Sequence, residues 1–128
     1  MKRINIGSGT VWEEKVGYSR AVRVNNMIEV SGTTATEDGK VVGKDDPYKQ
    51  TRFILEKISG VLKDLGSGIE YVVRTRMYVV NIHHWEEIGR AHAEFFSDIK
   101  PAATMVEVKS LIDPDLLIEI EVTALHNA

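Results

Sequence analysis

The sequence LLIEIEVTAL, residues 116–125, alternates strictly between two kinds of side chain. Successive side chains of a β-strand point to opposite faces of the sheet. One face of this strand is entirely apolar and consists of Leu116, Ile118, Ile120, Val122 and Ala124. The other face carries two carboxylates, Glu119 and Glu121. The pattern predicts a strand with one face on the core, and it raises the question of what the carboxylates contact.

The first half of the chain predicts a series of short strands. They lie at residues 3–6, 20–24 and 27–32. The Asn-Asn pair at 25–26 suits the positive-φ positions of a tight hairpin between the second and third of them. The Asp-Gly pair at 38–39 favours a further turn before a short apolar segment.

Two segments have helical periodicity. Asp46 followed by Pro47 is an N-cap followed by a first helical position, and apolar residues then recur at helical spacing until Gly66. A second helix is predicted from about residue 83 to 97. Its apolar stripe is formed by Trp85, Ile88, Ala91, Phe95 and Phe96.

Strands at 71–80, 104–108 and 117–125 complete the order ββ(β)αβαββ, which predicts an α+β fold with a mixed six-stranded sheet and two helices on one face. Two helices cannot cover both faces. By alternation, the second face collects mixed polar and apolar side chains, which suits subunit contacts and predicts an oligomer. This face is expected to contain Arg76, Tyr78, Met105, Glu107, Glu119, Glu121 and Leu125.

Composition limits the class of protein. A chain of 128 residues is long enough for one core, so residues 1–128 are expected to form a single domain. No apolar run is long enough for a membrane span, and no signal peptide is present, which favours a cytoplasmic protein. Cysteine is absent, so disulfides and thiolate chemistry are excluded. The net charge of −3 argues against a nucleic-acid partner.

The remaining motifs do not indicate a cofactor. His83 and His84 are adjacent and point about 100° apart on a helix, while His92 and His126 are remote in sequence, so no metal site is predicted. Ser31 lacks a nucleophile-elbow pattern and an activating histidine. The Gly-Ser-Gly triplets lack the flanking pattern of a phosphate-binding loop.

Three stretches together resemble one family. They are GYSRAVRVNNMIEVSGTTA at 17–35, AEFFSDIKPAATMVEV at 93–108 and IEIEVTAL at 118–125. With the element order, they resemble the Rid family of reactive intermediate imine or enamine deaminases, also called YjgF-type or endoribonuclease L-PSP proteins. The resemblance implies a chorismate-mutase-like α+β fold that forms a homotrimer around a central barrel, with small-molecule clefts between subunits.

The resemblance also implies roles for particular residues. Glu119 matches the family glutamate that positions the attacking water. Tyr18 matches a tyrosine of the cleft, and Ser31 and Gly32 match a Ser-Gly at a strand end, where backbone donors would hold the ligand. Tyr78 stands where the family has an aromatic residue that lines the cleft.

The family arginine that binds the substrate carboxylate is absent. The family motif P-A-R-S/T reads PAAT here, so Ala103 stands at the arginine position and Thr104 and Met105 follow. A methyl group cannot replace the paired hydrogen bonds of a guanidinium, and loss of such a contact costs about 2 to 5 kcal/mol where it is desolvated. Arg76, on the same strand face as Tyr78, is a candidate substitute. Glu121 is expected to form an interface ion pair with Arg74, Arg23 or Lys109.

Three functions are compatible with these observations. The first is a Rid-type trimeric enzyme that hydrolyses small enamine, imine or related carbonyl metabolites, with little activity on simple 2-imino acids. Glu119 is its catalytic residue, and the expected substrate-binding residues are Tyr18, Ser31, Gly32, Arg76, Tyr78, Ala103 and Met105. The second is a non-catalytic trimer that binds a small ligand or another protein. The third is a ribonuclease or translation inhibitor, against which the acidic balance counts.

Overall fold

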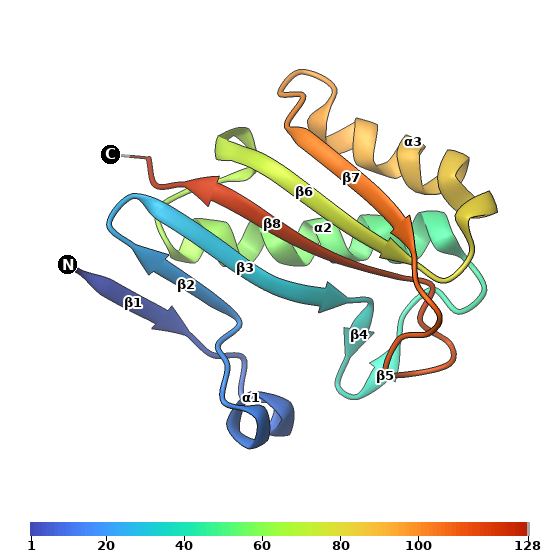
Figure 1. The fold of residues 1–128 in the computed structure, drawn as a ribbon, viewed down its shortest axis with the longest axis horizontal. Helices are drawn as coiled ribbons and strands as arrows, with labels where there is room; N and C mark the ends of the chain where they lie inside the picture. The colour runs from blue at the N-terminus through green and yellow to red at the C-terminus, as the bar shows by residue number, and fades with distance from the viewer. Residues whose placement is uncertain (128) are drawn as a thin grey trace.

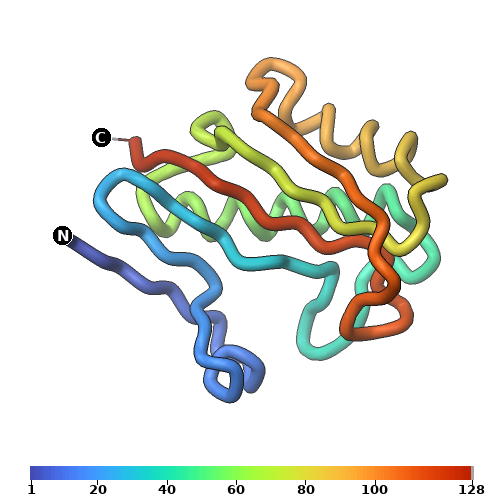
Figure 2. The backbone as a smooth tube through the Cα atoms, viewed as in Figure 1, coloured from blue at the N-terminus to red at the C-terminus, as the bar shows by residue number. Residues whose placement is uncertain are grey.

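A computed structural model describes residues 1–127 as a six-stranded mixed sheet with helices on one face (Figures 1 and 2). The strand order is β1-β2-β3-β8-β6-β7, and only the β6–β7 pair is parallel. The elements are β1 (Arg3–Ile6), α1 (Val11–Val16), β2 (Ala21–Val24), β3 (Met27–Thr34), β4 (Thr36–Glu37), β5 (Lys40–Val41), α2 (Pro47–Asp64), η1 (Ile69–Tyr71), β6 (Val72–Val79), η2 (Ile82–His84), α3 (Trp85–Phe96), β7 (Ala102–Glu107) and β8 (Ile118–Leu125).

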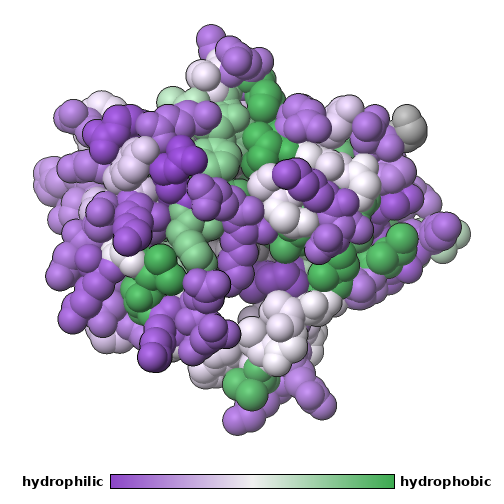
Figure 3. Space-filling model, turned by 180° about the vertical axis from the view of Figure 1, so that it is seen from behind, coloured by the Kyte–Doolittle hydropathy of each residue, from purple (hydrophilic) through white to green (hydrophobic). Residues whose placement is uncertain are grey.

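The core lies between the sheet and the helices α2 and α3 (Figure 1). The apolar face of β8 is buried there as predicted, and Ile118 and Ile120 are fully buried. The outer surface on the helix side is mainly hydrophilic (Figure 3), as expected for amphipathic helices whose apolar stripes face the sheet. Within residues 1–127, none of the helices combines the length and the apolar composition that a bilayer span requires.

The predicted turns and helix ends are present. Asn25 has φ 56° in the β2–β3 hairpin, and Asp38 and Gly39 have φ 52° and 76° in the turn between β4 and β5. The Asp46 side chain accepts a hydrogen bond from the amide of Lys49 at 2.9 Å, which caps α2. The pair β4–β5 forms a separate two-stranded ribbon instead of extending the main sheet.

Within residues 1–127, no helix covers the second face of the sheet (Figure 1). Arg76 pairs in register with Glu121, and Tyr78 with Glu119, so these side chains share this face as predicted. Exposed apolar residues lie among them: Met27 is 51% exposed, Val106 42% and Leu125 38%. The second face is therefore a mixed surface that a single chain leaves uncovered.

Two residues predicted for the second face lie on the helix side instead. Met105 pairs with Met77, and Glu107 pairs with Val79, and both partners are buried in the core. Met105 packs against that core, whereas Glu107 stays exposed because β7 is an edge strand. The prediction was wrong because alternation along a strand shows which residues share a face, but it does not show which of the two faces packs against the core. Trp85, predicted in the apolar stripe of the second helix, is 57% exposed.

Gln50, on α2, is fully buried and connects two loops to the helix. Its amide nitrogen donates to the carbonyl oxygens of Gly43 and Asp115, at 3.1 and 3.0 Å. Its amide oxygen accepts from the backbone N–H of Leu117 at 2.8 Å. One side chain thus satisfies three backbone groups and fixes the approach to β8.

Replacement of Gln50 with leucine is expected to lower the free energy of unfolding by about 3 kcal/mol, because it leaves three buried backbone groups without partners. Denaturant unfolding of both proteins measures the difference. Lys49→Leu is the control, since Lys49 is an exposed neighbour in the same helix turn and its replacement should change stability by about 0.5 kcal/mol or less. Equal stabilities for Gln50→Leu and the control would contradict this role.

Candidate functional site

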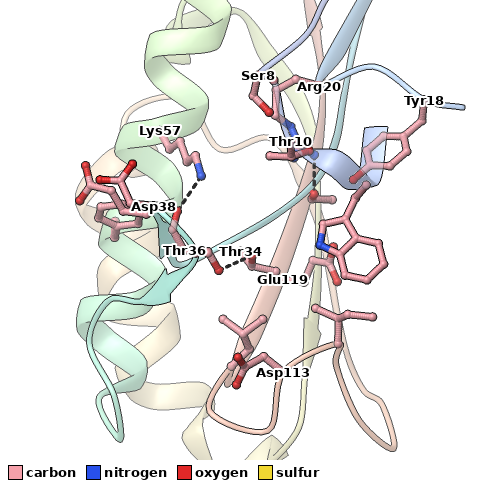
Figure 4. A pocket seen from close by; sticks show the side chains of 18 of the residues that line it. Ser8, Thr10, Tyr18, Arg20, Thr34, Thr36, Asp38, Lys57, Asp113 and Glu119 are labelled. Carbon is pink, nitrogen blue, oxygen red and sulfur yellow. Dashed lines mark hydrogen bonds between the residues drawn. The ribbon is translucent and has the colours of Figure 1, made fainter. Parts of the chain in front are cut away.

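A cleft of about 960 Å³ opens beside the end of β3, where four separate segments meet (Figure 4). One wall comes from the loop before α1 and from α1 itself, and another from β4 and the turn that follows it. Residues 53–57 of α2 and residues 112–116, before β8, complete it. Glu119 lines the cleft from β8.

A β-bulge shapes the cleft. Val30 pairs with Val122 and Thr33 pairs with Ile120, so Ser31 and Gly32 together oppose the single residue Glu121. The bulge brings the backbone of Gly32 close to Glu119. A Cβ atom on Gly32 would lie 2.4 Å from the Glu119 Oε2 atom, so glycine is needed for the carboxylate to lie where it does.

The Glu119 carboxylate has an unusual electrostatic environment. Burial raises its pKa above the ordinary value, and the nearby Glu121 adds to the rise, while the Arg20 guanidinium opposes it. Glu119 is half-buried and therefore still reaches the space of the cleft. A carboxylate with a raised pKa is a stronger base than an ordinary glutamate, so one that faces a cleft is a candidate for proton transfer.

Two cations line the same cleft. The Arg20 guanidinium donates to the carbonyl oxygen of Gly32, and the Lys57 ammonium donates to the carbonyl oxygen of Thr36 at 2.9 Å (Figure 4). Burial lowers the pKa of Lys57, and the positive charge of Arg20 lowers it further. The cleft therefore contains two cationic groups, and its lining also includes the carboxylates of Glu37, Asp38, Glu56, Asp113 and Glu119.

The wall formed by α1 depends on Glu13. The Glu13 carboxylate is buried and accepts hydrogen bonds from the backbone N–H of Ser8, at 2.9 Å, and from the Ser8 hydroxyl. Burial acts to raise the pKa of Glu13, but these hydrogen bonds and the charge of Arg20 together lower it. The contact closes the loop before α1, and Trp12, the residue before Glu13, lines the cleft.

Three of the predicted site residues meet in this cleft: Tyr18, Gly32 and Glu119. Ser31 is adjacent but lies in a smaller groove that Tyr18 also lines. Its hydroxyl donates to the carbonyl oxygen of Ser19 at 2.6 Å, and its N–H donates to that of Arg20 at 3.0 Å. Ser31 thus fixes the loop that precedes β2, and its backbone donor is occupied within the chain.

The other four predicted residues lie outside the cleft of their own chain. Arg76 Nε is 3.9 Å from Glu121, and the Tyr78 hydroxyl donates to the same carboxylate at 2.7 Å. Glu121 therefore pairs with Arg76, whereas Arg74, one of the expected partners, donates to Thr104. The hydrogen bond to Glu121 is the main cause that raises the pKa of Tyr78. Ala103 and Met105 lie on the edge strand β7.

Sequence reasoning did not identify Arg20, Trp12 or Lys57 as site residues. Arg20 had a usable signal, because it directly precedes the first strand residue, Ala21, which is buried, and alternation then assigns Arg20 to the face of Glu119. Trp12 lies in a helix of only six residues, too short for a periodic pattern. Lys57 lies on α2 and reaches the cleft by its length.

Comparison with known proteins extends these observations. The family described as Endoribonuclease L-PSP matches residues 12–126. An uncharacterized protein of Streptomyces coelicolor is 36% identical over 123 residues, which cover 96% of this chain and 92% of that protein. The 3-aminoacrylate deaminase RutC of Acinetobacter baylyi is 33% identical over 104 residues, covering 80% and 82% of the two chains.

Solved structures agree in fold. The crystal structure of a YjgF/YER057c/UK114 family member from Mycobacterium tuberculosis is 44% identical to this chain, has a TM-score of 0.88, and is matched over 97% of this chain and 99% of its own. The six-stranded α+β architecture is therefore the chorismate-mutase-like fold of these proteins. By sequence and by structure, the chain belongs to the endoribonuclease L-PSP family, which is also called the YjgF, RutC or Rid family.

Proposed function

We propose that this protein is a Rid-type enzyme that hydrolyses small enamine or imine metabolites, or related carbonyl compounds, with Glu119 as the residue that orients the attacking water. The observation that carries this proposal is the half-buried Glu119 carboxylate, whose pKa burial raises and which faces a cleft large enough for a metabolite. The name of the Acinetobacter baylyi relative supports a deaminase.

The proposed step is a hydrolysis. Water that is hydrogen-bonded to Glu119 attacks the imine carbon, and Glu119 accepts the water proton as the new C–O bond forms. The same carboxyl group returns that proton to the nitrogen. The resulting carbinolamine loses ammonia and leaves a carbonyl compound, so no oxidant or cofactor is consumed. Gly32 would keep the carboxylate at the required place, and the rings of Tyr18 and Trp12 would border the ligand.

The proposal includes a homotrimer in which the second face of the sheet is covered by neighbouring chains. Exposed Met27, Val106 and Leu125 lie among half-buried polar residues on that face, a composition typical of subunit interfaces. Neighbouring copies would then bring Tyr78, Arg76 and the edge strand β7 toward each cleft. Ala103 offers no guanidinium from that strand, so we expect little activity on simple 2-imino acids.

Turnover of 3-aminoacrylate and of 2-iminopropionate tests the chemistry. Glu119→Gln should lower the rate with the better substrate by about a hundredfold or more, because an amide cannot accept the water proton. Gly32→Ala should also lower it, since the added methyl group displaces the Glu119 carboxylate. Ammonia release is the measurement, and 2-iminopropionate is expected to be the poorer substrate.

Glu86→Gln is the matched control for this assay. Glu86 is an exposed carboxylate on α3, on the helix side of the sheet and outside the cleft, and its replacement should leave the rate unchanged. A wild-type rate in Glu119→Gln would refute the proposed role of Glu119. Ligand binding without any turnover would instead favour the non-catalytic alternative.

The mass in solution tests the trimer. Light scattering should give three times the mass of the chain for the wild type. Val106→Glu and Leu125→Glu should shift the mass toward that of one chain, because each buries a charge in the expected interface. Trp85→Glu is the control, since Trp85 is an exposed apolar residue on α3, on the opposite side of the sheet (Figure 1). A wild-type mass equal to one chain would rule out the inter-subunit cleft.

The raised pKa of Glu119 also predicts a dependence of stability on pH. Above this raised pKa the folded protein holds a partly desolvated charge, which Glu119→Gln removes. At neutral pH, the free energy of unfolding of the variant should therefore be higher by about 0.5 kcal/mol, and the variant should unfold at a higher temperature. The gain should shrink as the pH falls through the raised pKa and disappear below the ordinary value of 4.5, where Glu119 is neutral in both the folded and the unfolded protein. Melting curves across this range measure it, and a gain that grows at low pH would contradict the assignment.

A further inference from the structure

Arg20 is a cation in the cleft that the proposed mechanism does not use. Its Nη2 atom donates to the Gly32 carbonyl oxygen, but among residues 1–127 its Nε is buried without a hydrogen-bond partner. The ion pairs of this part of the chain involve Arg52 and Arg76, and none involves Arg20. A guanidinium presents donors in a fixed fork, so Arg20 retains unsatisfied donors beside the cleft.

Gly32 brings Arg20 and Glu119 within the length of one small molecule. The guanidinium contacts the carbonyl oxygen of Gly32, while the Glu119 carboxylate lies against its Cα. The two charged groups nevertheless form no direct ion pair. Both groups line the cleft (Figure 4). A ligand between them could accept hydrogen bonds from Arg20 at one end and lie beside the Glu119 carboxylate at the other.

Lys57 strengthens the argument for an anion. It lines the cleft with Arg20, and the positive charge of Arg20 disfavours the charged form of Lys57. Two cations that repel each other in a partly buried space are stabilised when an anion binds between or beside them. Four further carboxylates line the cleft: Glu37, Asp38, Glu56 and Asp113. Glu37 partly favours the charged form of Lys57, and Glu56 pairs with Arg52. Among residues 1–127, none of the four forms an ion pair with Arg20.

We propose that Arg20 binds the carboxylate of the substrate, and so supplies from the same chain the anion-binding group that Ala103 cannot supply from β7. This inference rests on the proposed function and defines its substrate class: small carboxylic acids whose imine or enamine carbon lies further from the carboxylate than it does in a 2-imino acid, because Arg20 and Glu119 contact different atoms of Gly32. The carboxylate lies at Arg20, near the loop before α1, and the reactive carbon lies over Glu119. Trp12 and Tyr18 border the rest of the molecule.

This arrangement differs from the earlier candidate, Arg76. Arg76 is next to Glu121 and shares that carboxylate with Tyr78, so its charge is already balanced within the chain. The charge of Arg20 interacts with Glu13 and Glu119, but within residues 1–127 Arg20 forms no ion pair with either, and it lines the cleft. If Arg20 had a purely structural role and only held the Gly32 carbonyl oxygen, its replacement would affect charged and uncharged ligands equally. A comparison of the two kinds of ligand therefore tests the inference.

The test uses pyruvate, the product that hydrolysis of 2-iminopropionate yields, and its uncharged analogue pyruvamide. Each is titrated into the full-length protein, and binding is followed by NMR. Pyruvate should bind more tightly than pyruvamide, and Arg20→Gln should weaken pyruvate binding about tenfold or more while leaving pyruvamide unaffected. Arg20→Lys, which keeps the charge without the fork, should lie between the two. Arg23→Gln is the matched control, because the Arg23 guanidinium donates to Asn25 outside the cleft.

A second measurement needs no variant and covers the case in which Arg20→Gln does not fold. The Nε–H resonance of Arg20 in the wild type should shift when pyruvate binds and remain unchanged with pyruvamide. Equal affinities of wild type and Arg20→Gln for pyruvate, an unshifted Nε–H resonance, or the absence of pyruvate binding to the wild type would each overturn the inference. Loss of Glu119-dependent turnover would remove the proposed enzyme function alone, since these binding measurements do not depend on catalysis.

Discussion

The contact between Glu119 and Gly32 is the constraint on which the cleft depends. The carboxylate lies where a side chain at position 32 would have to be, 2.4 Å from an ideal Cβ. The bulge at Ser31 and Gly32 creates this approach by placing two residues of β3 opposite one residue of β8. The backbone on one side and the cleft on the other leave Glu119 only partly hydrated, which is the main reason that its pKa is raised.

The two carboxylates of β8 have different environments although they share one face. Glu121 accepts a hydrogen bond from Tyr78 and lies beside Arg76, so its charge is stabilised by neighbours on β6. Glu119 has no such partner on its own sheet, and the opposing charge of Arg20 only partly offsets its burial. Two residues apart on one strand, one glutamate is bound by its neighbours, and the other has the raised pKa that the proposed role in proton transfer requires.

Much of the fold follows from local patterns in the sequence. Alternation identified β8 and its buried face, and the Asp46-Pro47 start identified α2, because capping and strand periodicity depend on neighbours in sequence. Met105 was assigned to the wrong face because the orientation of β7 is decided by its parallel pairing with β6. The resemblance pointed to Gly32 and Tyr18, which line the cleft. The cleft is also lined by Trp12 and Lys57, and it joins segments that only the tertiary structure brings together.

Whether anion binding depends on a neighbouring subunit is decided by where the anion-binding cation lies, at position 103 or at Arg20. Ala103 lies on the edge strand β7 and outside the cleft of its own chain, so a cation at that position could act only on the cleft of a neighbouring copy. Arg20 and Glu119 instead belong to one chain, and Gly32 fixes their separation. An anion held by Arg20 would therefore be oriented toward Glu119 by the β-bulge of the same chain, whichever residues a neighbouring copy adds to the cleft.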